Sequence, residues 1–251
     1  MSAASLYLLH TQPDQRLLST WMVRHRTGDL GDALHGLLRA AFGAQAPQPF
    51  RYLDERRGLL AYTHLDAQAM ATQVALADPL AAQTLGLAAC SNHGGYRLRP
   101  FPTQWPQDKE LGFEVRVRPT VRSGQKEQDA FLHAVALAGG ADGAPVDRQA
   151  VYAQWLREHL AVREGAPRQP WQGAVQLLDM QLSAFARNRA MRRTQPAGDS
   201  TRKGHAIEGP DAILSGRLRV TDPTAFSHLL ARGVGRHRAY GFGMLLLQRA
   251  D

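Results

Sequence analysis

A glycine-rich segment near the C-terminus carries the strongest chemical pattern in this sequence. Residues 233–243 contain four glycines together with Arg236, His237 and Arg238. Glycines let a backbone approach a partner closely, exposed amide donors can hold phosphate oxygens, and the two arginines would add charge-assisted contacts. The segment lacks the Lys-Ser/Thr pair of a P-loop, and it follows a predicted helix and precedes a strand, which excludes a Rossmann fingerprint. The alternative interpretation is a tight structural turn.

A histidine and an arginine share one face of a predicted helix in the N-terminal half. Leucines and alanines recur with helical spacing over residues 30–41, which predicts an amphipathic helix. His35 and Arg39 are four positions apart, so both side chains can point at one phosphate. Imidazole titrates near neutral pH and suits proton transfer, whereas a guanidinium stays charged and suits an anion. Arg24 precedes the helix and can join from the same side; the alternative for His35 is a helix-surface or core-edge position.

The chain of 251 residues is strongly basic, with 30 Lys and Arg against 22 Asp and Glu and a net charge of +8. The charge gathers in three places, of which the glycine-rich segment is one and a predicted strand with Arg116 and Arg118 is another. The third is an Arg-rich stretch that contains Arg187, Arg189, Arg192, Arg193, Arg202 and Lys203. Few acids balance these clusters, which favours a shared surface for a polyanion over separate solvated faces.

Composition excludes several other classes of protein. Apolar residues make up 44% and charged residues 21%, as in an ordinary globular protein. No apolar run approaches the roughly 20 residues that cross a bilayer, and the N-terminus lacks the pattern of a secretory signal. Cys90 is the single cysteine, so neither an internal disulfide nor a cysteine-based zinc site is expected. We therefore expect a cytoplasmic protein without a membrane partner, a metal or another cofactor.

The order of predicted elements in the first half indicates a ferredoxin-like unit. A short strand precedes the helix that carries His35, and two strands then form a hairpin. A second helix is stopped by Asp78-Pro79, and an alternating strand follows. This strand–helix–strand–strand–helix–strand order defines the ferredoxin-like fold. The predicted elements are strands at 5–10, 50–53, 59–64 and 111–121 and helices at 30–43 and 66–76, which gives a first domain of residues 1–118.

The second half predicts another ferredoxin-like unit, residues 119–251, with an insertion. Its helix has Asp222 as the N-cap and Pro223 in the first turn, the favoured positions of these residues. The predicted insertion, residues 122–205, is mostly helical and ends in the basic stretch, which we expect to be an exposed hairpin or loop. The other predicted elements are strands at 175–185, 211–220 and 244–248 and helices at 125–137 and 148–160. The expected fold class is α+β, with tandem ferredoxin-like (RRM-like) domains.

Three segments resemble the CRISPR-associated endoribonucleases that cut repeat RNA. Residues 211–243 match the family's strand, Asp-Pro helix and C-terminal glycine-rich loop. Residues 34–42 (LHGLLRAAF) are similar to the helix that carries the family's active-site histidine. Residues 113–119 resemble a strand that ends in Asn-Pro in type I-E members, where this chain has Arg118 instead of Asn. The resemblance is to the type I-E branch or its type IV counterpart, and the insertion matches neither well.

The resemblance implies a tandem ferredoxin-like fold and metal-independent cleavage of precursor CRISPR RNA. The ribose 2′-OH would attack the scissile phosphate and leave a 2′,3′-cyclic phosphate and a 5′-OH. Such a reaction needs a proton acceptor, a proton donor and positive charge on the phosphorane. His35 is the candidate acid or base. In the alternative, Arg24 and Arg39 dominate by orienting the 2′-OH and stabilising the phosphorane.

The expected partners are a CRISPR repeat stem-loop RNA and other subunits of a CRISPR complex. Arg238 matches the basic residue of the family's loop, and the Arg-rich stretch would grip the RNA stem, because duplex RNA is read through shape, phosphates and 2′-hydroxyls. One alternative is a noncatalytic RNA-binding subunit with the same fold. Another is a basic ferredoxin-like protein whose glycine-rich segment is only a turn.

Overall fold

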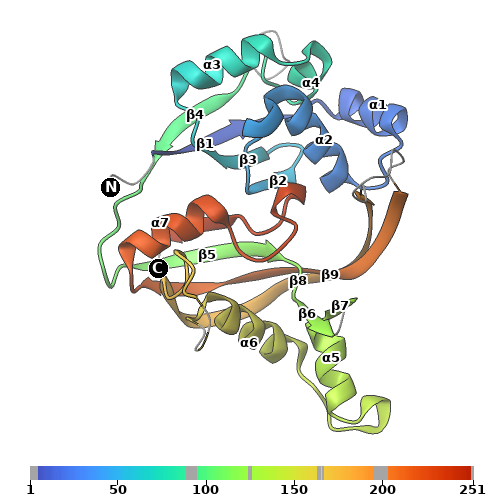
Figure 1. Ribbon diagram of the computed structural model, residues 1–251, viewed down its shortest axis with the longest axis vertical. Coiled ribbons are helices and arrows are strands. Elements are labelled where there is room, and N and C mark those ends of the chain that lie inside the picture. The colour runs from blue at the N-terminus through green and yellow to red at the C-terminus, as the bar shows by residue number, and fades with distance from the viewer. Residues whose placement is uncertain are drawn as a thin grey trace.

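The computed structural model of the protein describes residues 5–88, 95–123, 126–162, 165, 167–194 and 203–249. These residues form two four-stranded antiparallel sheets and a separate two-stranded hairpin. Figure 1 shows the first sheet with its helices on one side of the molecule and the second sheet beside it.

The first sheet has the strand order of a ferredoxin-like fold, β2-β3-β1-β4. Its strands are β1 Leu6–Thr11, β2 Phe50–Asp54, β3 Gly58–Thr63 and β4 Arg97–Phe101. Four helices connect them: α1 Gln15–His25, α2 Leu30–Phe42, α3 Ala67–Leu76 and α4 Pro79–Thr84, with the 3-10 turn η1 Gly43–Gln45 after α2. Aspartates begin all four helices by accepting hydrogen bonds from first-turn amides, which is the role of an N-cap.

The second sheet repeats the same order with its own strands, β10-β5-β9-β8. They are β5 Glu110–Val117, β8 Val175–Thr194, β9 Lys203–Val220 and β10 Leu245–Arg249. Between β5 and β8 lie β6 Thr120–Ser123, β7 Lys126–Asp129, α5 Ala130–Leu137, the 3-10 turn η2 Gly140–Asp142 and α6 Arg148–Leu160. Helix α7 Pro223–Arg232 and the 3-10 turn η3 Arg238–Tyr240 lead to β10. The tandem ferredoxin-like fold is therefore confirmed.

One strand belongs to a different sheet from the one the sequence predicted. The strand expected at 111–121 was assigned to the first unit, but β5 pairs with β9 and β10. The fourth strand of the first sheet is β4, which the sequence analysis missed. β4 contains Pro100 and is mostly exposed, as is typical of an edge strand that alternation does not reveal. The strand pairing thus puts Glu110–Val117 in the second sheet, whereas the predicted boundary at residue 118 put them in the first unit.

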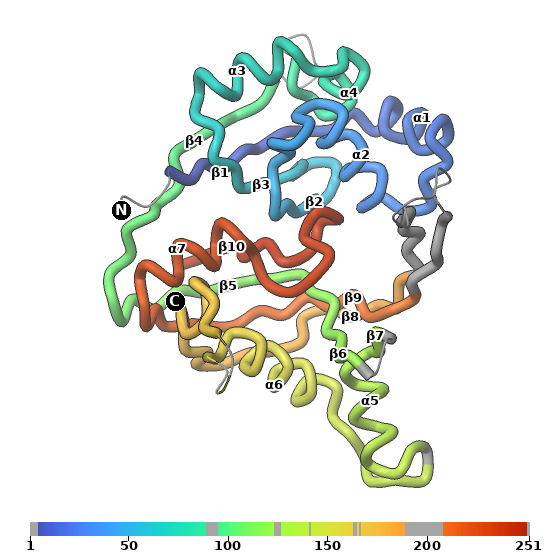
Figure 2. Tube along the Cα trace, viewed as in Figure 1, coloured from blue at the N-terminus to red at the C-terminus, as the bar shows by residue number. Residues whose placement is uncertain are grey.

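The insertion is helical only in its first part. α6 confirms the helix predicted at 148–160, whereas the helix predicted at 125–137 begins only at Ala130, because Lys126–Asp129 form β7. The basic stretch forms part of a long β8–β9 ladder that pairs residues as far as Thr194 and Lys203. The tube in Figure 2 shows α5 and the segment after it extending away from both sheets. No helix within the described ranges is long and apolar enough to cross a membrane.

Two hydrophobic cores hold the units, and one of them is shared. The first lies under α2, α3 and α4, where Leu37 and Met70 are fully buried. The second surrounds β5 and α7 and also includes Leu6, Leu8 and Tyr62 from the first sheet. The Tyr62 hydroxyl donates to the carbonyl of Leu245 at 2.9 Å. The two units therefore pack directly against each other.

Candidate functional site

Helix α2 holds two of the predicted site residues on its solvent side. Leu34, Leu37 and Leu38 are buried in the first core, so the opposite face of the helix is fixed outward. His35 on that face is half-buried, and Arg39 one turn later is exposed. The sequence prediction that these two side chains share a face is thus met.

A cleft of about 400 Å³ lies in front of His35 and Arg39. The residues after α2, from Ala44 to Gln48, form much of its wall, and Ala239 of the glycine-rich loop closes it from the second unit. The His35 ring also lies against the Tyr240 ring, with 4.7 Å between their centroids. The histidine helix and the glycine-rich loop, far apart in sequence, thus wall one cleft.

The glycines of the loop are required by its tight closure. Gly243 has a φ of +79°, and a Cβ there would lie 2.2 Å from the Val234 carbonyl oxygen. Gly233 has a φ of +78°, and its Cβ would lie 2.8 Å from the Gly243 carbonyl oxygen. Only glycine adopts such angles at so close an approach without strain. The structural interpretation of these glycines is therefore correct at both ends of the loop.

Several loop amides are already used within the protein, contrary to their expected role at phosphates. The amide of Gly235 donates to His159 Nε2 at 3.0 Å. The amides of Gly233 and Gly243 donate to the carbonyls of Leu229 and Arg116, each at 2.7 Å. The sequence pattern could not show this, because the acceptors come from α6, α7 and β5. These three amides are therefore not available to a ligand, and the loop would contact one through its side chains instead.

Two of the three basic residues of the loop share one partner, and the third has another. Arg236 forms an ion pair with Glu127 of β7 at 2.5 Å, and the His237 Nε2 lies 3.5 Å from the same carboxylate. Arg236 is still more than half exposed. Arg238 is half-buried, lines a cleft and donates to the carbonyl of Arg232 at 2.8 Å. Burial lowers the pKa of Arg238.

Arg116 and Arg118, predicted to bind RNA, both make contacts with other parts of the protein. Arg116 forms a two-pronged ion pair with Asp211 of β9 and covers the Phe242 ring at 4.6 Å. Arg118 is only 2% exposed. Arg116 lies on β5 and Arg118 just past its end, and both approach the Phe242 ring of the glycine-rich loop, in line with the predicted common face. Both side chains thus make contacts within the protein, although the Arg116 side chain is still 26% exposed, and RNA binding by either residue stays a prediction.

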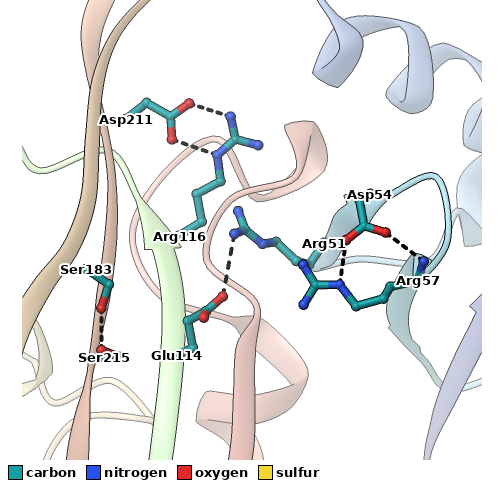
Figure 3. A network of polar contacts seen from close by, with 8 residues as sticks. All are labelled: Arg51, Asp54, Arg57, Glu114, Arg116, Ser183, Asp211 and Ser215. Carbon is teal, nitrogen blue, oxygen red and sulfur yellow. Dashed lines mark hydrogen bonds and ion pairs between the residues drawn. The ribbon is translucent and has the colours of Figure 1, made fainter.

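Next to Arg116, an ion pair joins the two units (Figure 3). Arg51 of β2 is 8% exposed and lies 3.5 Å from Glu114 of β5. Burial lowers the pKa of Arg51, the charge of Arg116 lowers it further, and Glu114 opposes both effects. A guanidinium of the first unit is thus held by a carboxylate of the second.

The predicted stem-binding arginines lie along the β8–β9 ladder. Arg187 is half exposed and pairs with Glu208 at 3.3 Å. The backbones of Arg189, Arg192, Arg193 and Lys203 continue the ladder, and Arg202 lies outside the described residues. The described part of the basic stretch is therefore a two-stranded arm of β8 and β9, in line with the hairpin alternative of the prediction.

Arg24 does not join the cleft. It is exposed in the last turn of α1, and it is not among the described residues that line the cleft in front of His35. The neighbouring His25 stacks on Trp21, with 3.8 Å between the ring centroids. Of the three predicted catalytic residues, the structure brings His35 and Arg39 together and leaves Arg24 one helix away.

Comparison with known proteins identifies the family. A model of the family described as CRISPR associated protein matches residues 6–249. The chain belongs to this family. No curated protein gives a significant match to the sequence.

This CRISPR-associated protein also shares its fold with solved structures. The CRISPR endoribonuclease Cse3 bound to a 19-nucleotide RNA aligns with a TM-score of 0.58 and 18% identity, covering 97% of this chain and 99% of that chain. Cse3 of Thermus thermophilus, bound to an RNA representing a pre-cleavage complex, aligns with a TM-score of 0.56 and 16% identity, covering 97% and 98%. A chain of a CRISPR RNA-guided surveillance complex gives 0.52 and 19%, covering 97% and 100%. At these identities the likeness shows a common fold.

Sequence reasoning missed three residues of this CRISPR-associated protein's cleft region. Tyr240 follows Arg236 and Arg238 in the loop, but nothing in its spacing places it against His35. Gln48 follows the helix of His35, and Arg232 ends α7; both line cleft walls. Arg232 directly precedes the glycine-rich loop, and this position at a helix end was the one available signal.

Proposed function

We propose that this protein is an endoribonuclease that cuts the repeat hairpin of precursor CRISPR RNA. The observation that carries the proposal is the cleft in which His35 and Arg39 of the first unit face the glycine-rich loop of the second. It combines a proton-transfer group with fixed positive charge, the two requirements for cutting RNA through its own 2′-OH. Family membership and the fold shared with Cse3 support the same activity.

In the proposed reaction the 2′-oxygen attacks the adjacent phosphorus, and the bond from phosphorus to the 5′-oxygen breaks. The 2′-OH proton must leave and the 5′-oxygen must gain a proton, so the products are a 2′,3′-cyclic phosphate and a 5′-OH. His35 exchanges one of these protons, because imidazole is both donor and acceptor near neutral pH. Arg39 stabilises the phosphorane by charge. No metal ion or other cofactor takes part in the proposed scheme.

Arg24 acts in this scheme on the RNA outside the cleft or, in the alternative, as a member of an arginine-based site. An exposed arginine at a helix end can reach a bound backbone without lining the pocket. Arg39 is then the residue common to both schemes, since it lines the cleft and stays charged. The two schemes differ in whether removal of the His35 imidazole stops the reaction.

The RNA stem would lie along the β8–β9 arm, where Arg187 and the arginines that follow it extend from the second sheet. Phosphates and 2′-hydroxyls of a duplex fit such an extended basic element. The protein would stay on its product and become a subunit of a larger CRISPR complex. The fold shared with a chain of a CRISPR RNA-guided surveillance complex supports this assignment.

A noncatalytic RNA-binding subunit is the second candidate function. The observation that favours it is the packing of His35 against Tyr240, since a histidine ring held by an aromatic neighbour can serve packing alone. The same basic surfaces would then bind the repeat without cutting it.

A cleavage assay separates these functions. The purified protein is incubated with the hairpin repeat of its own CRISPR array in EDTA, and RNA binding is measured in parallel. The wild type is compared with His35→Ala, Arg24→Ala and Arg39→Ala. We expect His35→Ala to bind but to lose at least about a hundredfold in rate. Cutting by His35→Ala but not by the arginine variants would support the arginine-based site. Tight binding without cutting by the wild type would support the noncatalytic subunit. A wild type that neither binds nor cuts the repeat RNA would overturn the proposal.

A further inference from the structure

A second cleft of about 440 Å³ adjoins the cleft of His35. The two share Ala44 and the segment that contains Pro47 and Gln48 as a common wall. On the opposite side, consecutive residues of the glycine-rich loop divide between them: Ala239 lines the cleft of His35, and Arg238 lines the second cleft. The two clefts are therefore neighbours.

The second cleft contains two half-buried arginines, Arg232 and Arg238. Within the part of the chain that the structure describes, neither forms an ion pair with a carboxylate. Their contacts are to backbone carbonyls and to an aromatic ring: Arg232 donates to the Gly233 carbonyl at 3.1 Å and covers the Trp171 ring at 4.2 Å. Burial lowers the pKa of Arg232 to about 10, and the neighbouring charge of Arg238 adds to the effect. With a pKa of about 10, the Arg232 guanidinium remains charged at neutral pH.

Three other arginines near this region lie beside carboxylates. Arg116 is paired with Asp211, Arg51 lies near Glu114, and Arg236 is held by Glu127. Two adjacent cations that face a cleft without an acid are unfavourable in the free protein, because burial and mutual repulsion both penalise their charge. An anion bound between them would remove that penalty, which is the signature of a ligand site.

The remaining walls of the second cleft fit a nucleotide. Gln48 and His64 add polar groups, and the His64 Nδ1 donates to the Ser5 carbonyl at 2.9 Å, which fixes its ring. Leu65 and Ala231 give part of the lining an apolar character. A charged rim over a partly apolar wall matches a phosphate joined to a sugar and a base.

We propose that Arg232 and Arg238 bind the phosphate next to the scissile phosphate, so that the nucleotide beside the cut occupies the second cleft. The inference rests on the proposed function. It adds Arg232, a residue outside the glycine-rich loop, to the RNA-binding residues and makes it a positioning residue for the strand that enters the cleft of His35.

The test uses repeat hairpins that carry 2′-deoxyribose at the cut, so that binding is measured without cleavage. One phosphate at a time is replaced by an uncharged methylphosphonate, on either side of the cut and in the stem. In the wild type we expect one neighbouring position to raise the Kd about tenfold, the effect of a lost charge-assisted contact. In Arg232→Gln the same replacement should have no further effect, while replacements in the stem keep theirs. The slope of log Kd against log salt concentration should also be smaller in Arg232→Gln, by about the contribution of one phosphate contact.

Two further variants make the result specific. Arg157→Gln removes the same charge from an exposed position of α6 and should respond to every replacement as the wild type does. Arg232→Lys keeps the charge and should retain the response at the neighbouring phosphate. This variant is used if Arg232→Gln proves unstable in thermal unfolding. A full response to that phosphate in Arg232→Gln overturns the subsite, as does a wild type that binds the hairpin with no response beside the cut. A wild type that binds no repeat RNA overturns the proposed function itself.

Discussion

Arg232 shows at the residue scale how a ligand site lowers the stability of the protein that carries it. Its guanidinium is half-buried at the end of α7 and has an arginine as its charged neighbour. The lowered pKa means that the folded state holds the proton on Arg232 less firmly than the unfolded state does. The charge of Arg232 therefore lowers the free energy of unfolding by its full amount below about pH 10. This penalty disappears as the pH rises toward the unfolded-state pKa.

Arg232→Met should therefore stabilise the free protein at pH 7. The methionine keeps an apolar stem beside Trp171 and removes the charge. After allowance for solvent screening we expect a gain of about 1 kcal/mol in the free energy of unfolding. Denaturant unfolding at pH 7 and pH 11 would measure it, and the difference from the wild type should shrink at the higher pH. A less stable variant at pH 7 would mean that stacking on Trp171 outweighs the burial cost.

At the element scale, the position of the glycine-rich loop depends on what α2 and α6 leave open for it. A Cβ on Gly31 in α2 would lie 2.6 Å from the Tyr240 carbonyl oxygen. From the other side, His159 of α6 accepts from the Gly235 amide and stacks between Trp155 and Trp171. Elements from both units thus set where the loop lies relative to His35.

Gly31→Ala should displace the loop although alanine favours helix formation. The clash is with backbone, so relief requires movement of η3 away from α2. We expect cleavage to fall about tenfold, since a shift of about 1 Å in a reacting group has effects of this order or larger. Gly36→Ala is the matched control in the same helix, because its nearest neighbour, Trp21 Nε1, would lie at 3.8 Å. That change should raise stability by about 1 kcal/mol. Equal cleavage rates in the Gly31→Ala variant and the wild type would contradict the role given to this contact.

His159 should act on RNA binding through the loop and not through direct contact. His159→Ala removes the acceptor of the Gly235 amide, and we expect the Kd for repeat RNA to rise about fivefold to tenfold because the loop is less fixed. His159→Gln restores an acceptor near Nε2 and should recover most of the affinity, with the single-turnover rate at saturation little changed. Failure of glutamine to recover more affinity than alanine would show that ring stacking, not the hydrogen bond, positions the loop.

At the scale of the whole molecule, local signals in the sequence were reliable and long-range ones were not. Asp222 caps its helix as its position predicted, because capping involves only neighbouring residues. The sheet of β5 could not be read from its alternation, since alternation shows a buried face but not the strand that pairs with it. Likewise the spacing of His35 and Arg39 predicted their common face, whereas the meeting of His35 with Tyr240 depends on the packing of two units.

The same packing makes the contact between Arg51 and Glu114 a test of how the units are joined. Glu114→Gln leaves the buried Arg51 guanidinium without its carboxylate, beside the charge of Arg116. We expect a loss of about 2 kcal/mol in the free energy of unfolding, less than for a fully buried pair because Glu114 is partly exposed. Adding Arg51→Met should recover most of this loss, because both charges are then absent.

Arg57 provides the comparison, since its ion pair with Asp54 lies on the surface of the same unit (Figure 3). Screening by water should make Arg57→Gln indistinguishable from the wild type in denaturant unfolding. The Arg51 and Glu114 variants should also slow RNA cleavage, because the cleft of His35 is walled by both units and opens when their contact loosens. A Glu114→Gln variant as stable and as active as the wild type would mean that the shared core alone, through Leu6, Leu8 and Tyr62, fixes the two units.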